Sequence, residues 1–196
     1  MTTRHQLAGV LLAAGRGSRF DPTGAKNKLM QLLPDGDAVV GAAAKNLLAV
    51  VPVVVAVVRP GTPEVVSTLQ ALGCEVTECQ SAGEGMAASL VHGLSRVADA
   101  DGWIIALGDM PHVQTATMTA LSDALCNGAD IVVPTYQGRR GNPVAFGRVH
   151  LLRLLQLTDD QGARKLLQEF PVLEIAVADP GIHHDVDSQA DLSRRP

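Results

Sequence analysis

Short apolar runs that alternate with helix-like segments are the feature that most limits the folds open to this chain. The clearest run is residues 53–58, Val-Val-Val-Ala-Val-Val, which lacks polar alternation and therefore predicts a strand covered on both faces. Residues 7–13 and 103–107 also read as buried strands. Strands that alternate with helices build parallel sheets. The pattern therefore predicts an α/β fold with a mostly parallel sheet.

The same alternation continues along the whole chain. Further helices are predicted for residues 42–50, 62–72, 85–97, 115–126, 149–155, 162–169 and 188–192, and extended segments for 75–78, 131–133, 141–146 and 172–177. No linker, repeat or low-complexity stretch divides the sequence, so residues 1–196 are predicted to form one domain. In such folds, ligands bind at the carboxyl ends of the strands.

Composition argues against several classes of partner. The net charge of −4 offers no basic field for nucleic acid, and an aromatic content of 3% offers few surfaces for base stacking. The apolar run at 47–58 contains Pro52 and is too short for a bilayer, which needs roughly 20 residues. Three cysteines without a CxxC pair suit a reducing compartment. We expect a cytoplasmic protein that binds neither nucleic acid nor membranes.

A glycine-rich loop, Gly15-Arg16-Gly17-Ser18-Arg19, directly follows the first predicted strand. Its glycines let backbone N–H groups approach a polyphosphate, and Arg16, Arg19 and Lys28 can supply countercharge. Phe20 at the third glycine position excludes a dinucleotide fingerprint, and the absence of Gly-Lys-Ser/Thr excludes a Walker A loop. The loop predicts an anion site, although a purely structural turn would have a similar sequence.

Two acidic segments are candidates for a metal site. Asp109 follows the buried strand 103–107, where a carboxylate can hold Mg²⁺ together with phosphate oxygens. Asp187 comes late in the chain, in Asp185-Val186-Asp187-Ser188, and alternation in an extended segment puts Asp185 on the same face. The alternatives are an Asx turn or helix cap at Asp109, and capping of the last helix by the later pair.

Two more segments combine glycine with polar groups. Residues 83–89 place Ser89 near the start of a helix, which suits either a nucleobase pocket or an ordinary helix entry. Residues 138–143, Gly-Arg-Arg-Gly-Asn-Pro, are basic and suit an anionic second substrate, although a solvated turn would have a similar sequence.

Six blocks, in order, resemble the MobA-like nucleotidyltransferases, and among them most closely the molybdenum cofactor cytidylyltransferases. The blocks are Leu12-Ala13-Ala14-Gly15-Arg16-Gly17-Ser18-Arg19-Phe20 with Lys28-Leu29, then residues 84–90, 107–111, 134–143, 160–164 and 185–188. They cover nearly the whole chain.

The resemblance implies a Rossmann-like three-layer sandwich of the nucleotide-diphospho-sugar transferase type. It implies transfer of CMP from CTP to the phosphate of the molybdenum cofactor with Mg²⁺, and a molybdoenzyme or its maturation factor as a further partner. The implied nucleotide-binding residues are Leu12, Ala13, Ala14, Gly15, Gly17, Arg19, Lys28, Gly83, Gly85, Ser89 and Asp109. Arg19, Lys28 and Asp109 are implied in catalysis, Asp109 and Asp187 in metal binding, and Arg139, Arg140, Gly141 and Asn142 in acceptor binding.

The chain departs from the family pattern at two places. Residues 21–25 lengthen the glycine-rich loop, so that Lys26 competes with Lys28 for the phosphate role. Asn142 stands where such proteins often carry His, which leaves a hydrogen-bonding role rather than acid–base chemistry. The alternatives are a guanylyltransferase, a nucleotidyltransferase for another phosphate acceptor, and a non-catalytic carrier of the molybdenum cofactor. The Ala13-Ala14-Gly15 form of the loop resembles the cytidylyl members and favours CTP, because guanylyl members more often carry two glycines there.

Overall fold

The computed structural model describes residues 6–23, 26–158 and 163–193. Within these residues, eight strands form one sheet in the order β3-β2-β1-β4-β7-β5-β6, with β8 also paired to β5. The strands are β1 (Leu7–Ala13), β2 (Val53–Val58), β3 (Glu75–Glu78), β4 (Gly102–Leu107), β5 (Ile131–Tyr136), β6 (Arg139–Arg140), β7 (Val144–Gly147) and β8 (Leu173–Ala176). Strand β7 runs antiparallel to β4 and β5, whereas β1 to β4 pair in parallel. The prediction of a mostly parallel sheet is confirmed.

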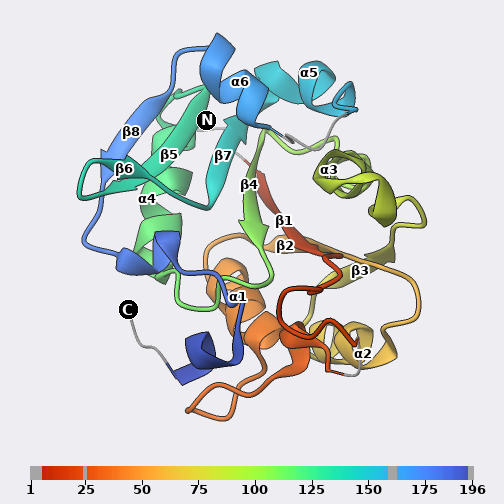
Figure 1. Cartoon of the computed structure of the whole chain (residues 1–196). Helices are drawn as coiled ribbons and strands as arrows, with labels where there is room; N and C mark the ends of the chain where they lie inside the picture. The colour runs from red at the N-terminus through yellow and green to blue at the C-terminus, as the bar shows by residue number, and fades with distance from the viewer. Residues whose placement is uncertain (1–5, 24–25, 159–162, 194–196) are drawn as a thin grey trace.

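Helices cover both faces of this sheet (Figure 1). They are α1 (Val39–Leu48), α2 (Pro63–Ala71), α3 (Met86–Leu94), α4 (Thr115–Cys126), α5 (Leu151–Leu155) and α6 (Arg164–Glu169). One apolar core joins α1, α2 and α4 to the sheet, and a second joins α3, α5 and α6 to it. The fold is therefore the predicted Rossmann-like three-layer sandwich. No helix in the described part of the chain is long and apolar enough to cross a membrane.

Several predicted boundaries move for identifiable reasons. The helix expected at 42–50 begins at Val39, whose N–H bonds to the Gln31 carbonyl across a tight turn. Of the extended segment expected at 141–146, only Val144–Phe146 lies in a strand, β7, and the short strand β6 precedes it at Arg139–Arg140. The short helix expected at 188–192 is a 3-10 turn, Gln189–Ser193, in which the Asp191 carboxylate accepts the Ser188 N–H at 2.8 Å. Part of the helix expected at 162–169 lies outside the described residues.

The carboxyl ends of β1 and β4 lie side by side at the point where the strand order reverses. The chain continues from β1 to β2 on one side and later returns to place β4 on the other. Such a switch point is where open α/β sheets bind ligands. Gly108, just after β4, donates its N–H to the Leu12 carbonyl at 2.9 Å. A Cβ at Gly108 would lie 3.1 Å from that of Ala13, so glycine permits this close approach.

All three cysteines are free thiols. Cys74 and Cys79 are buried, whereas Cys126 is exposed. Burial raises the pKa of the Cys74 thiol to about 11, because the thiolate would lose its hydration. Cys74 is therefore protonated at neutral pH.

Helix α3 packs so closely on β1 and β2 that position 93 has room for glycine alone. A Cβ at Gly93 would lie 2.7 Å from Cγ atoms of Val10 and Val57. We expect Gly93→Ala to lower the free energy of unfolding by about 1–3 kcal/mol, measured by urea denaturation.

Gly41 in α1 is the matched control, because the nearest atom to a Cβ there is 3.7 Å away. Gly41→Ala should raise the free energy of unfolding by up to about 1 kcal/mol, through better helix propensity. Equal effects at the two positions would contradict the tight packing of α3.

Candidate nucleotide and metal site

The glycine-rich loop leaves β1 and turns back over Lys28. Gly17 has a φ of 63°, in the left-handed region that favours glycine. A Cβ at Gly17 would lie 3.3 Å from Cγ of Lys28, so the loop backbone rests on the lysine stem. The turn closes where the N–H groups of Phe20 and Asp21 bond to the Gly17 carbonyl, and Phe20 is buried in the core. The loop is therefore anchored at its end and open along its backbone.

Lys28 lies at the centre of a charged cluster beneath this loop. The residue is 8% exposed, and its Nζ lies 2.6 Å from Oδ2 of Asp109 and 3.4 Å from Oδ1 of Asp187. Arg19 pairs with the other carboxylate oxygen of Asp187. Lys26 is exposed, and its backbone N–H donates to the Asp21 carboxylate. The structure therefore places Lys28, not Lys26, at the carboxylates. Gly24 and Ala25 of the inserted segment lie outside the described residues.

Three carboxylates converge at the same place. Oxygens of Asp109, Asp185 and Asp187 lie within 4.8 Å of one another. The Val186 N–H bonds to the Asp109 carbonyl at 2.8 Å, which ties the last segment to the end of β4. Carboxylate oxygens are the ligands that Mg²⁺ and Mn²⁺ prefer, so this donor set fits a hard divalent cation. Asp185, secondary in the sequence analysis, belongs to the cluster with the expected pair.

A cavity of about 310 Å³ opens beside the charged cluster. It is lined by Leu12, Ala14, Gly15, Arg16, Ala82, Gly83, Gly85, Met86, Ser89, Leu107 and Asp109. Six other residues expected to bind nucleotide therefore line the same cavity as Asp109. Ala13 is buried and does not line it. Ser89 is buried in the first turn of α3, next to Gly85, which has a φ of 125°. The cavity combines backbone amides, one hydroxyl and an arginine.

A second cavity, of about 400 Å³, adjoins the first. Its lining includes Leu12, Met86 and Leu107, which also line the first cavity. The remaining lining residues are Leu90, Ile105, Val133, Arg140, Gly141, Asn142, Val144, Ala163, Arg164 and Leu167. Molecules bound in the two cavities would therefore be neighbours. Three of the four expected acceptor residues lie here, whereas Arg139 lines neither cavity.

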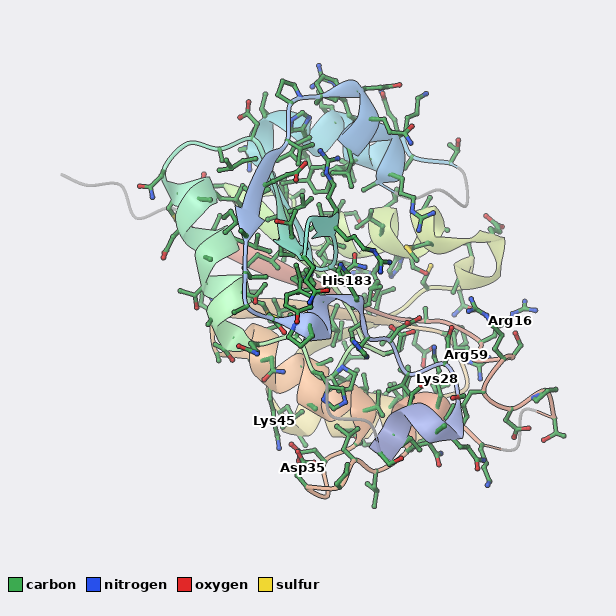
Figure 2. All side chains as sticks on the ribbon, turned by 60° about the vertical axis from the view of Figure 1, so that its left-hand side comes forward. Arg16, Lys28, Asp35, Lys45, Arg59 and His183 are labelled. Atoms are coloured by element: carbon green, nitrogen blue, oxygen red, sulfur yellow. The ribbon has the colours of Figure 1, made fainter. Side chains whose placement is uncertain are left out.

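The charges around the two cavities differ from the sequence expectation. Arg140 is paired with Glu174, with 2.7 Å between Nη2 and Oε1, which offsets its charge. Arg164 lines the same cavity and is exposed. Arg59 follows β2 and lies on the same side of the molecule as Arg16 and Lys28 (Figure 2), but it lines neither cavity.

Comparison with known proteins places the chain among nucleotidyltransferases. The family model described as the MobA-like NTP transferase domain matches residues 9–175. Rv0371c from Mycobacterium tuberculosis H37Rv is 30% identical, with 96% of each chain covered and a TM-score of 0.82. A structure of Rv0371c in complex with manganese is 31% identical over 95% of each chain, with a TM-score of 0.74.

Two further solved structures share the fold at lower identity. A nucleotidyl transferase from Methanothermobacter, Mth528, is 24% identical over 96% of this chain and 94% of that one, with a TM-score of 0.80. CMP:2-keto-3-deoxy-manno-octonic acid synthetase complexed with CTP is 18% identical over 95% of each chain, with a TM-score of 0.71. A search of curated proteins found no significant match.

The ammonium of Lys28 and a divalent cation would compete for the same carboxylate oxygens. We therefore expect Lys28→Met to bind Mn²⁺ more tightly than the wild type in the absence of nucleotide, by about fivefold to thirtyfold, which corresponds to one or two kcal/mol. Electron paramagnetic resonance of free Mn²⁺ measures this affinity directly. Lys26→Met, the control, should leave it unchanged. Weaker or equal binding by Lys28→Met would show that the lysine does not compete with the metal.

Proposed function

Because the chain belongs to the MobA-like NTP transferase domain family, we propose that it transfers CMP from CTP to the terminal phosphate of the molybdenum cofactor, releasing pyrophosphate. The observation that carries the proposal is the shared wall of the two cavities, next to three convergent carboxylates. A nucleotide in the first cavity and an acceptor in the second would meet beside Asp109. That arrangement suits group transfer between two bound substrates better than storage of one.

The reaction requires little covalent participation from protein side chains. A phosphate monoester is already anionic near neutral pH, so the acceptor oxygen needs no general base to attack the α-phosphorus of CTP. A bond forms between that oxygen and the α-phosphorus, the bond to the bridging oxygen of the β-phosphate breaks, and pyrophosphate carries away the electron pair. Alignment and charge neutralisation then supply the rate enhancement.

The cluster of acidic and basic side chains supplies the neutralisation. Asp109 and Asp187, with Asp185 beside them, would hold Mg²⁺. When bound, the ion offsets negative charge on the reacting phosphates. Lys28 and Arg19, which pair with these carboxylates, would turn to the phosphates of the leaving pyrophosphate. The manganese complex of Rv0371c supports the use of a divalent metal.

The first cavity is proposed to bind the cytidine end of the substrate. Backbone amides of Gly15 and Gly17 would hold the phosphates, because a glycine-rich turn after a strand presents N–H groups to an anion. Ser89, Gly83 and Gly85 would contact the base from the start of α3. Ala14 lines this cavity, and the Ala13-Ala14-Gly15 form of the loop supports cytosine, since guanylyl members of the family more often carry two glycines there.

Pyrophosphate release from each of the four nucleotides, with and without the molybdenum cofactor, tests the proposal. We expect release from CTP that depends on the cofactor. Release from GTP instead would assign a guanylyltransferase. A protein that binds the cofactor but releases no pyrophosphate from any nucleotide would be a carrier, and the proposed transfer would be wrong.

Asp109→Asn should lower the turnover number by at least about a hundredfold, because the variant lacks a carboxylate that would hold the metal beside the reacting phosphates. CTP binding, measured by titration calorimetry, should partly survive through the glycine-rich loop. Asp123→Asn, at an exposed position on α4, is the control and should keep full turnover. Turnover near the wild-type level in Asp109→Asn would remove Asp109 from the mechanism.

A further inference from the structure

Asp179 is a buried carboxylate outside both cavities. It is 1% exposed, and it forms no salt bridge with the described residues. Its oxygens accept the Gln114 N–H at 2.8 Å, the Thr117 hydroxyl at 2.6 Å and the Gly181 N–H at 2.9 Å. A buried charge is costly unless hydrogen bonds satisfy it, so the surrounding donors must be held in place around it. The carboxylate therefore joins two segments rigidly.

The first segment is the start of α4. Gln114 is the N-cap residue of this helix, and its own side chain makes no capping bond. Asp179, 65 positions further along the chain, accepts the N–H of this N-cap residue and the hydroxyl of Thr117 in the first turn of the helix. The N-terminal end of a helix carries exposed N–H groups and favours a negative charge, so the helix stabilises the buried carboxylate.

The second segment is the 3-10 turn Pro180–His183, which Asp179 also caps. A Cβ at Gly181 would lie 2.2 Å from the His112 carbonyl, so this turn is tightly seated. The buried Ile182 then accepts the Asn142 N–H at 3.0 Å with its carbonyl. A Cβ at Gly141 would lie 2.6 Å from the same carbonyl. The turn therefore sets the position of Gly141 and Asn142 in the second cavity.

We propose that Asp179 is the positioning residue of the acceptor cavity: its carboxylate fixes the turn 180–183 to α4, and the turn places Gly141 and Asn142. The proposal rests on the proposed function, since it takes the second cavity as the acceptor site. The nucleotide residues lie on β1, its loop and α3, which Asp179 does not contact. The metal ligands have separate anchors, through Val186 to Asp109 and through Asp191 to Ser188. Loss of Asp179 thus acts on acceptor binding.

Asp179→Asn tests this with a side chain of the same size. Its amide NH₂ cannot accept a hydrogen bond, so Gly181 loses its partner if the NH₂ replaces Oδ1, and Gln114 and Thr117 lose theirs if it replaces Oδ2. We expect the KM for the molybdenum cofactor to rise about tenfold or more, with the KM for CTP changed less than about twofold. Hydrogen exchange should become faster at residues 139–143 and 180–183. Thr117→Val removes one donor and should give a smaller change in the same direction.

Leu121→Ala is the matched control, because Leu121 is buried in the same helix and its loss weakens the packing of α4 without removing a hydrogen bond to Asp179 or to the turn. It should change the KM for the cofactor and the exchange of residues 139–143 much less than Asp179→Asn does. Equal effects of Asp179→Asn and Leu121→Ala would overturn the proposal, and so would unchanged exchange in Asp179→Asn. If Asp179→Asn does not fold, Thr117→Val carries the same comparison.

The two hypotheses fail in different ways. A wild-type protein that transfers no nucleotide would refute the proposed function. The exchange difference between Asp179→Asn and Leu121→Ala would still decide whether Asp179 holds the turn and the loop in place.

Discussion

The ion pair between Lys28 and Asp109 is the interaction on which the site depends. It joins two segments 81 residues apart, and the contact of the same ammonium with Asp187 adds a third. Burying an ammonium costs free energy that an acidic partner offsets, and the carboxylates would repel one another without the lysine. The lysine and the carboxylates therefore stabilise one another in the cluster. Because a buried ion pair is weak evidence for stability, we assign this one a role in binding.

The sheet brings these segments together. Strands β1 and β4 pair in parallel, so the glycine-rich loop and Asp109 leave the same edge at adjacent positions. Gly108 allows the two strand ends to approach without a side chain between them. The loop then rests on the lysine stem through Gly17. Apolar packing behind the edge supplies the rigidity, and the polar loops in front of it supply the chemistry.

Substrate placement depends on contacts between distant segments as much as on the motifs themselves. Leu12, Met86 and Leu107 form the wall that both cavities share, and they come from three separate elements. Asn142 is held by the carbonyl of Ile182, and the turn that contains Ile182 is held by Asp179. The proposed acceptor site therefore depends on a chain of hydrogen bonds that begins at a helix N-terminus. A motif read alone does not reveal this support.

The sequence by itself determined the layered α/β fold, because an unbroken valine strand such as Val53–Val58 requires cover on both faces. It also determined where polar groups follow strands, since glycine and aspartate after a buried run can lie only at the sheet edge. Tertiary structure alone placed Lys28 rather than Lys26 at the carboxylates, brought Asp185 to the other two, paired Arg140 with Glu174 and revealed Asp179. The physical reason is common to all four. Local pattern specifies which face a residue takes, whereas the partner of a charge is set by segments far away in the chain.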